Sequence, residues 1–438
     1  MSSAPAMPGP AGLLDAMVTI AIRVLSAVLV FALQVLLARL LPLEDYGGFI
    51  TIWTWMLALG SFAALGFAES SVRFLPRYRA RGRERQVQGF FRYGLKAVLI
   101  SAMALGGAAL VAAQFWGPQT STGLLVLLVG LGLPFLAIEY YLGGVARSFG
   151  WYRLTTIPVY IVRPILIGGT CLGLTLLGVQ LTLPLVGAIM VMAVAIIAIV
   201  VTLLVARRLR TLAPPVPTRA PQHQLWLRAS LPLLLVAGLD DLLTYADVLI
   251  ISVMLPAGDV GLYFAAARAL ALANFVTYAM HLVAGRRFSL DLASQSRAEL
   301  QRSILASTSM TFWMTLLAVA ATLIVGPWLL LAFGAQFTAG YGVMVVLGGG
   351  MVIRALAGQA GEVLVVTGRQ RESIAIATAT LLANVVMTVV LIALFGVIGA
   401  AIGTAIAMAG RTLALILVLA RTEKLRVVSL ALPRLRAA

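Results

Sequence analysis

Long apolar runs, separated by short polar segments, follow one another along the whole chain. A helix that crosses the ~30 Å hydrocarbon core of a bilayer needs about 20 apolar residues, and each run has roughly this length. Backbone polar groups in lipid must be bonded within a helix or a closed barrel, and runs without polar–apolar alternation predict helices. We therefore expect twelve spans, at residues 16–38, 46–68, 93–115, 123–145, 157–177, 184–206, 230–254, 261–283, 304–326, 341–363, 374–395 and 399–420.

The composition agrees with this pattern. The 438 residues are 61% hydrophobic and only 11% charged, and their mean hydropathy is +1.03. A soluble protein carries about 25% charged residues, more than twice this share. The chain is therefore expected to be an all-α polytopic membrane protein.

One short motif occurs twice, each time between two apolar runs. It reads Leu-Pro-Leu-Glu-Asp-Tyr-Gly at 41–47 and Leu-Pro-Ala-Gly-Asp-Val-Gly at 255–261, which is 214 residues later. At the same offset Arg207 recurs as Arg421. An internal repeat of this length predicts two structurally similar halves.

The repeat defines the expected lobes. Each half holds six predicted spans, so both halves start on the same side and are parallel, related by an axis along the membrane normal. We expect an N-terminal six-helix lobe at 1–206 and a C-terminal six-helix lobe at 229–438 with a basic tail. The cytoplasmic linker 207–228 contains Ala-Pro-Pro-Val-Pro at 213–217, which favours an extended, semi-rigid segment.

The basic residues indicate the orientation of the spans. Most of the 32 Lys and Arg residues lie in loops on one side, whereas the loops on the other side hold only Arg39. Basic loops face the cytoplasm, which places both termini there. This asymmetry accounts for the net charge of +17, so no nucleic-acid partner is expected. The basic segments are 69–92, 146–154, 207–228, 285–303, 367–373 and the tail 421–438.

Several kinds of chemistry lack the residues they need. Cys171 is the single cysteine, and His223 and His281 have no Cys or His nearby in the sequence, so no metal site is expected. Neither lysine, Lys96 or Lys424, follows the glycine pattern of a phosphate-binding loop. No cofactor and no ATP hydrolysis are expected; a gradient, the membrane potential or substrate mass action would drive transport.

Charged residues inside the spans are the candidate functional groups. A charge at mid-membrane costs about 2.5–3.5 kcal/mol on insertion scales, so these side chains must line a wet cavity or pair with one another. Lys96 lies near the end of its span and is expected to extend to the interface. The others are Arg23, Arg163, Arg268, Arg354 and Arg411, with Glu139, Asp240, Asp241, Asp247 and Glu362.

The repeat separates function from folding for the arginines. Their counterparts at the repeat offset are uncharged, so the shared scaffold does not require them, and a substrate-binding role is favoured. Gln34 lies on the same helical face as Arg23 and joins this set. The alternative is internal Arg–Asp pairing that locks the halves together. Arg23, Arg163, Arg268, Arg354 and Arg411 match Ala237, Ala377, Thr54, Tyr140 and Ile197.

The acids are candidates for a coupling ion. Asp240 and Asp247 lie on one face of a predicted helix, where carboxylates can hold a proton or Na⁺. Glu139 and Glu362 are further candidates. Arg354 and Glu362 would share a face of span 341–363, about 12 Å apart along the axis, which is too far for a direct pair.

The C-terminal tail combines basic residues with Leu and Val. Such a segment can lie on the anionic cytoplasmic leaflet, which would make membrane lipids a partner. The alternative is a frayed, solvated tail. The basic residues are Arg421, Lys424, Arg426, Arg434 and Arg436.

Two segments resemble a known family. Residues 39–47, Arg-Leu-Leu-Pro-Leu-Glu-Asp-Tyr-Gly, are similar to the first loop of bacterial polysaccharide flippases, as is the run 65–78 that enters a basic loop. These flippases belong to the multidrug/oligosaccharidyl-lipid/polysaccharide exporter (MOP) superfamily. The motif resemblance covers roughly residues 14–92, and two six-helix halves agree with it over the rest. The lipid II flippase branch usually has fourteen spans, two more than predicted here.

The resemblance implies a fold and a function. The family fold is two helical lobes around a central cavity that opens alternately to each side, with arginines lining it; Arg23 and Arg268 look like such positions. The implied substrate is an oligosaccharide on a polyprenyl diphosphate such as undecaprenyl diphosphate. It would move to the outer leaflet of a bacterial inner membrane for lipopolysaccharide or exopolysaccharide synthesis. Polysaccharide polymerases and glycosyltransferases would be partners, and H⁺ or Na⁺ the coupling ion.

Three other functions remain open at this stage. A multidrug/cation antiporter of the same superfamily is the nearest, although an acid in the first span would favour it and this span has Arg23. A membrane glycan polymerase or glycosyltransferase would need a large outward loop, and the longest, 327–340, is short. A scaffold for glycan synthesis without transport would leave the charges in the spans unexplained.

Overall fold

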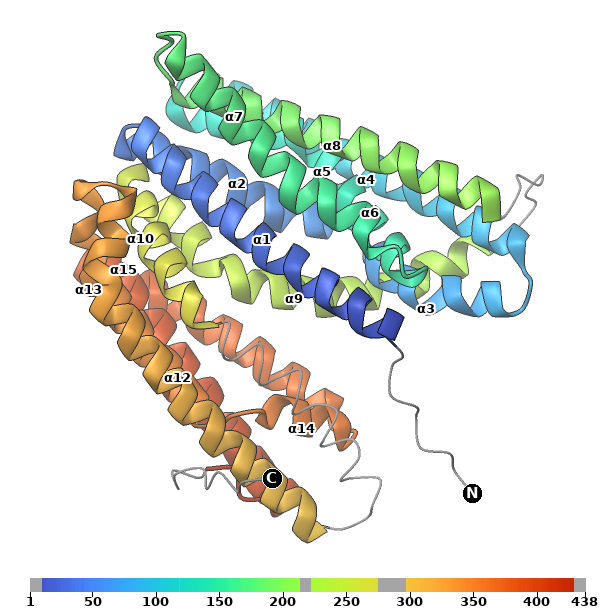
Figure 1. Ribbon diagram of the computed structural model, residues 1–438, viewed down its shortest axis with the longest axis vertical. Helices are drawn as coiled ribbons and strands as arrows, with labels where there is room; N and C mark the ends of the chain where they lie inside the picture. Colours follow the sequence, from blue (N-terminus) through green and yellow to red (C-terminus); the bar gives the residue numbers. More distant parts are fainter. Residues whose placement is uncertain (1–9, 118, 213–221, 275–296, 429–438) are drawn as a thin grey trace. The chain divides into compact units, whose positions relative to one another are not determined.

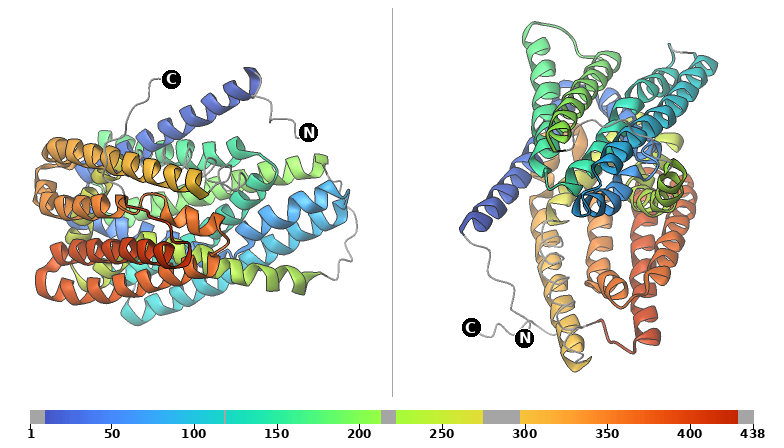
Figure 2. Two further views of the ribbon diagram at one scale, coloured as in Figure 1. Left: turned by 90° about the horizontal axis from the view of Figure 1, so that it is seen from below. Right: turned by 90° about the vertical axis from the view of Figure 1, so that its right-hand side faces the viewer.

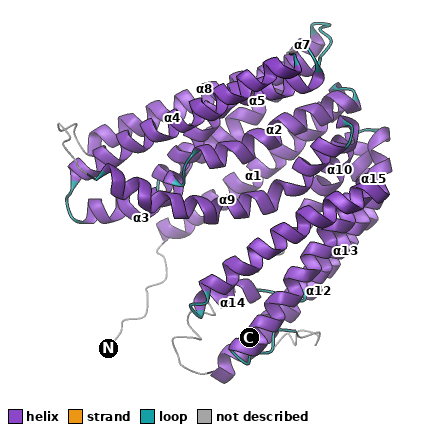
Figure 3. Cartoon of the chain, turned by 180° about the vertical axis from the view of Figure 1, so that it is seen from behind, coloured by secondary structure: helices purple, strands orange, loops and turns teal. Residues whose placement is uncertain are grey.

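The computed structural model describes residues 10–117, 119–212, 222–274 and 297–428 (Figure 1). This part of the chain is helical, and Figure 3 shows no strand in it. By contacts the chain divides into two compact units. Unit 1 is Met1–Leu41 with Trp55–Ala237, and unit 2 is Pro42–Thr54 with Gly238–Ala438.

The helices of unit 1 follow the predicted spans. Helix α2 begins in unit 2, and α9 ends there, so each contributes to both units. The elements are α1 (Pro10–Leu40), α2 (Leu43–Ala63), α3 (Phe67–Ala80), α4 (Glu84–Trp116), α5 (Ser121–Ser148), α6 (Tyr152–Ile157), the π-helical turn η1 (Pro158–Val162), α7 (Arg163–Leu176), α8 (Leu183–Leu212) and α9 (His223–Met254).

Unit 2 combines the start of α2 with the second half of the chain. Its helix α13 packs against both α12 and α15, and Figure 2 shows these helices from two further sides. The elements are α10 (Ala257–Leu270), the 3₁₀ turn η2 (Ala271–Ala273), α12 (Arg297–Phe333), the 3₁₀ turn η3 (Ala335–Gly340), α13 (Tyr341–Ala355), α14 (Ala360–Val366) and α15 (Gln370–Thr422).

Seven helices in the described ranges are long and apolar enough to cross a membrane, and an eighth if α2 and α3, bent by 44°, form one span. The chain is therefore a multi-pass membrane protein. Every predicted span falls at least in part on a described helix. The total of twelve spans and the lobe boundaries at 206 and 229 stay predictions.

Two predicted spans are interrupted. Span 46–68 ends early, because Leu65 and Gly66 have φ of 51° and 69° and turn the chain before α3. Span 341–363 is broken between α13 and α14, where Gly358 has φ of 50°. Glycine reaches this left-handed region without the steric cost of a Cβ. The expectation that Arg354 and Glu362 share the face of one continuous helix is therefore wrong.

The last two predicted spans are the two halves of α15. The chain reverses at Gly396, whose φ and ψ are 59° and −139°. After the turn, Gly399 and Gly403 lie against the first half, where added Cβ atoms would come within 1.9 Å of Leu391 O and 2.8 Å of Thr388. Small residues let membrane helices approach closely, which explains how this hairpin packs.

Small residues also allow α4 and α5 of unit 1 to pack along their length. A Cβ at Gly94 would lie 2.5 Å from the Tyr141 hydroxyl, and one at Gly106 would lie 2.7 Å from the carbonyl oxygen of Gly130. The Tyr141 hydroxyl donates a hydrogen bond of 2.9 Å to the Phe91 carbonyl. This contact satisfies a buried polar group that lipid could not satisfy.

The two copies of the repeated motif contact each other within unit 2. A Cβ on Gly47 would lie 3.1 Å from Gly261 N, and one on Gly261 would lie 3.3 Å from Gly47 Cα. The Gly258 N–H donates to Glu44 Oε2 at 2.8 Å, again between positions 214 apart. Burial and, to a smaller extent, the charge of Glu44 raise the pKa of Asp259. The self-contact of equivalent glycines indicates local two-fold pseudo-symmetry at the motif.

The first part of the tail is docked on unit 2. Gln301 of α12 donates to the Arg426 carbonyl at 2.6 Å and accepts from its N–H at 2.8 Å. Leu425 and Val427 are buried. The frayed alternative is thus excluded for this stretch. Arg434 and Arg436 lie outside the described residues.

Candidate substrate-binding site

Two of the predicted arginines lie close together in unit 2. Arg354 is in the last turn of α13, and Arg411 is in the second half of α15, which packs against α13. Both are half-buried, and the two positive charges act on each other. Arg354 Nη2 donates a hydrogen bond of 3.1 Å to Asn274 Oδ1. These two half-buried positive charges form a local positive centre.

A third predicted arginine, Arg268 of α10, has an aromatic environment. Its guanidinium carbon lies 5.7 Å from the centre of the Phe264 ring. Tyr46 and Tyr245 lie within electrostatic reach of it. Tyr46 is the tyrosine of the first repeated motif, and its ring packs edge-on against Phe337 at 5.4 Å. The Arg268 guanidinium therefore lies near aromatic side chains.

These three arginines have no carboxylate partner among the described residues. Arg268, Arg354 and Arg411 make no ion pair there, although each is half-buried within a predicted span. A buried charge without a partner is costly, and a bound anion would remove that cost. Guanidinium groups suit phosphate because they donate two parallel hydrogen bonds and stay charged.

Arg163 of unit 1 behaves differently. Its Nη1 lies 2.7 Å from Glu139 Oε2, and the two side chains are only 8% and 5% exposed. Arg163 follows the π-helical turn η1, which changes the helical register at this point. The structure thus supplies the internal pairing that the sequence left as an alternative, although here the pair lies within one unit.

The other predicted residues of unit 1 are less closely defined. Gln34 is buried, at 4% exposure, and makes polar contacts. The side chain of Arg23 lies outside the described part of α1. The role of both in substrate binding stays a prediction.

Among the coupling-ion candidates, Asp247 has a defined set of donors. The Tyr263 hydroxyl donates to Oδ2 at 2.6 Å, and the Val248 N–H donates to Oδ1 at 2.8 Å. Tyr263 also interacts with Thr404 of α15. The donors are neutral, so the carboxylate is held without a counter-charge from them.

The surroundings of the remaining candidate acids are less closely defined. Glu362 is half-buried on α14, and Asp241 makes polar contacts of its own. The side chain of Asp240 lies outside the description. No group of three or more His, Cys, Asp or Glu suited to a metal ion occurs among the residues that were placed.

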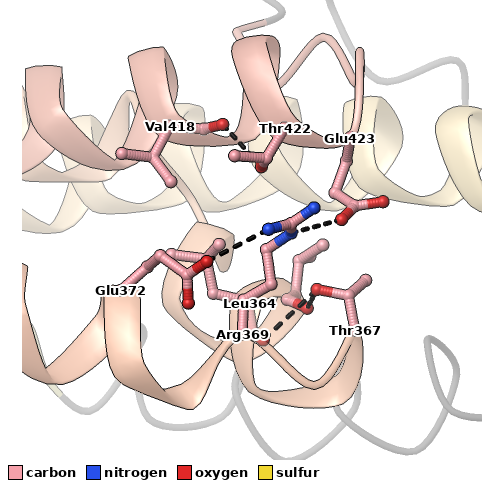
Figure 4. Close-up of polar contacts among 8 residues, drawn as sticks. Leu364, Thr367, Arg369, Glu372, Val418, Thr422 and Glu423 are labelled. Carbon is pink, nitrogen blue, oxygen red and sulfur yellow. Dashed lines mark hydrogen bonds and ion pairs between the residues drawn. The ribbon is translucent and has the colours of Figure 1, made fainter.

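Outside the spans, an arginine is held entirely by acids (Figure 4). Arg369 lies just before α15. Its Nε donates a hydrogen bond to Glu423 Oε1, and its Nη1 lies 3.0 Å from Glu372 Oε1. Hydrogen bonds to Glu423 and Glu372, in that order of importance, raise the pKa of Arg369. A hydrogen bond from a backbone N–H and, to a smaller extent, one from Arg369 lower the pKa of Glu372. This cluster fastens the two ends of α15 together, which is a structural role.

Four neighbours of the candidate residues were missed from the sequence. They are Tyr46, Tyr245, Tyr263 and Asn274. Tyrosine and asparagine carry no formal charge, so the insertion-cost argument does not select them. Only Tyr46 carried a signal, because it lies in the repeated motif.

Solved structures with a similar arrangement of helices include the following membrane proteins. An inward-facing multidrug resistance MATE family transporter of the MOP superfamily is 14% identical, with coverage of 89% of this chain and 92% of the other and a TM-score of 0.70. The lipid II flippase MurJ, in an inward closed conformation, is 15% identical, with coverage of 92% and 87% and a TM-score of 0.71. A MOP superfamily transporter from Pyrococcus furiosus is 14% identical, with coverage of 92% and 91% and a TM-score of 0.59.

These likenesses show that the chain has a fold similar to that of MOP superfamily transporters. A family model described as "Polysaccharide biosynthesis protein" matches residues 13–284, more than half of the chain. The chain therefore belongs to this family of polysaccharide biosynthesis proteins. No curated protein matches it. The predicted fold class and the resemblance stated from the sequence are confirmed.

Proposed function

We propose that this protein is a flippase that moves an oligosaccharide linked to a polyprenyl diphosphate from the cytoplasmic to the outer leaflet of a bacterial inner membrane. One observation carries the proposal: Arg268, Arg354 and Arg411 are half-buried in unit 2 and lack a carboxylate partner among the described residues. Membership of the polysaccharide biosynthesis family supports the glycan.

The chemistry of the substrate fits these residues. A diphosphate needs its hydration replaced by donors when it enters the membrane, and guanidinium groups supply paired donors. Arg354 and Arg411 repel each other, and an anion between them would relieve the repulsion. Several separate arginines favour moderate binding, which lets the carrier release its cargo on the other side. The lipid tail would stay in the bilayer.

Transport would proceed by alternating access without ATP. We propose Asp247 as the site of a coupling H⁺ or Na⁺, because its carboxylate accepts hydrogen bonds from two neutral donors, the Tyr263 hydroxyl and the Val248 N–H. Glu139 is a weaker candidate, since Arg163 already neutralises it. Both termini would be cytoplasmic, and glycan polymerases and glycosyltransferases would act before and after the transport step.

Cells in which this gene is the only source of the activity would test the arginines. Arg268→Ala, Arg354→Ala and Arg411→Ala are each expected to lower surface glycan at least about tenfold, the loss of one charge-assisted interaction. The lipid-linked precursor should accumulate, and the protein level in the membrane should stay near normal. Lysine at these positions should rescue in part, since it keeps the charge and loses the paired donors.

Arg302→Ala is the matched control, because Arg302 is an exposed arginine at the polar start of α12. It should leave surface glycan unchanged. Normal export by the triple alanine variant would refute the cationic site. Loss of the folded protein from the membrane in that variant would assign the arginines to structure.

A further inference from the structure

A pocket of about 510 Å³ is lined by residues of unit 1, whereas the proposed substrate arginines belong to unit 2. It is formed by α4, the first turns of α9 and the turn after α2, and we call it the α4–α9 pocket. Its lining includes Leu65, Arg92, Tyr93, Lys96, Ile100 and His223, and no acid is among its lining residues.

The residues of α4 that line the pocket lie along one face of the helix. Arg92, Lys96 and Ile100 are spaced by four residues, so they lie one above the other on the same face. Ile100 and Met103 are each 59% exposed, which extends this face as an apolar surface. The stripe thus changes from two cations to aliphatic side chains within about two turns.

The second wall is held in place by a buried aromatic cluster. Trp226 of α9 is fully buried, and its Nε1 donates to the Tyr78 hydroxyl at 2.9 Å. Ser230 Oγ donates to Ser70 Oγ at 2.7 Å. One turn before Trp226, the His223 ring stacks on the Tyr93 ring, with ring centres 4.5 Å apart and an angle of 8° between the ring planes. These contacts fix a flat, polar-edged wall beside the two cations.

The pocket lies at a level where lipid headgroups are expected. Arg92 ends a predicted basic loop, Lys96 lies three residues into the span that follows, and His223 lies shortly before another span. Lysine and arginine at such positions extend to the interface, and basic pockets on the cytoplasmic side bind anionic headgroups.

We propose that the α4–α9 pocket binds an anionic phospholipid, with the headgroup phosphate on Arg92 and Lys96 and an acyl chain along Ile100 and Met103. The absence of a lining acid gives the pocket a net positive charge, which selects an anionic headgroup over a zwitterionic one. The exposed apolar stripe selects a lipid over a free anion. This inference concerns unit 1 and does not rest on the proposed transport substrate.

Native mass spectrometry of the purified full-length protein in neutral detergent tests it. Phosphatidylglycerol should bind more tightly than phosphatidylcholine. The double variant Arg92→Gln/Lys96→Gln should weaken phosphatidylglycerol binding about thirtyfold, because each cation near an anionic surface contributes roughly 1 kcal/mol. Ile100→Glu, which adds a carboxylate to the same pocket, should cause a similar loss.

The matched control is Arg207→Gln/Arg210→Gln, which removes two exposed arginines from the last turns of α8 in the same unit. It should retain binding. Equal losses in both double variants, or equal binding of the two phospholipids, would overturn the proposal. So would displacement of the lipid by equimolar inorganic phosphate or a stronger preference of this pocket for a polyprenyl diphosphate.

Discussion

At the scale of single residues, the charged groups in the spans fall into two sets with different partners. Arg163 and Glu139 form a buried ion pair in unit 1, while Arg268, Arg354 and Arg411 of unit 2 have no such partner among the described residues. Breaking a buried pair leaves an uncompensated charge and costs about 3–5 kcal/mol. We therefore expect the first set to support folding and propose that the second set binds the substrate.

Substitution of the two best-placed acids should separate these roles. Asp247→Asn is expected to keep substrate binding and to abolish the dependence of transport on an ion gradient, because it removes a carboxylate held by neutral donors. Glu139→Gln should instead reduce the amount of folded protein, since it leaves Arg163 buried without a counter-charge. Transport under imposed H⁺ and Na⁺ gradients, with gel filtration for folding, measures both effects.

Unchanged gradient dependence in the Asp247 variant would assign that residue to structure.

The sequence identified all of these charges, because the cost of placing a charge in lipid selects them. It did not identify which are paired, since Glu139 and Arg163 lie on different helices and their approach depends on packing around η1.

At the scale of elements, the repeated motif determines how two helix starts meet. Gly47 of α2 and Gly261 of α10 pack backbone to backbone, and Glu44 accepts from the N–H of Gly258 at the start of α10. An acid at a helix N-terminus is favoured by the helix dipole. The two copies of the motif therefore form one contact with each other, which gives a structural reason for the repeat.

Alanine at Gly47 should disrupt this contact. Its Cβ would lie 1.6 Å from the Ala257 carbonyl oxygen, so the two backbones must move apart. Gly349→Ala is the control, because a Cβ there meets nothing within 4 Å. Thermal unfolding in detergent should show a clear drop in melting temperature for Gly47→Ala and almost none for Gly349→Ala. Equal melting temperatures would contradict the packing role of Gly47.

Helix breaks were the least predictable elements. The turn at Gly396 was expected because it separates two apolar runs, whereas those at Gly66 and Gly358 lie inside continuous runs. Glycine is tolerated within membrane helices, so the residue type alone does not mark a break. The hydropathy pattern therefore predicts where apolar helix lies and leaves its interruptions undetermined.

At the scale of the whole molecule, the sequence predicted the class of protein well. Hydropathy and length follow directly from the thickness of a bilayer, and the all-α membrane fold and the family are confirmed. The contacts place Pro42–Thr54 in unit 2, an assignment that chain order alone does not give. The glycan, the direction of movement and the coupling ion remain proposals.

We propose that this chain moves a lipid-linked glycan by means of arginines in its spans. The most direct measurement uses liposomes that contain the purified protein and a polyprenyl-diphosphate-linked oligosaccharide. A membrane-impermeant glycan-cleaving enzyme reports how much of the inner-leaflet pool reaches the outside.

With the wild-type chain, we predict that the inner-leaflet pool becomes accessible to the enzyme, and that Arg354→Ala/Arg411→Ala leaves it protected while Arg302→Ala behaves as wild type. A pool that stays protected with the wild-type chain, or one that the double variant exposes at the wild-type rate, would contradict the account.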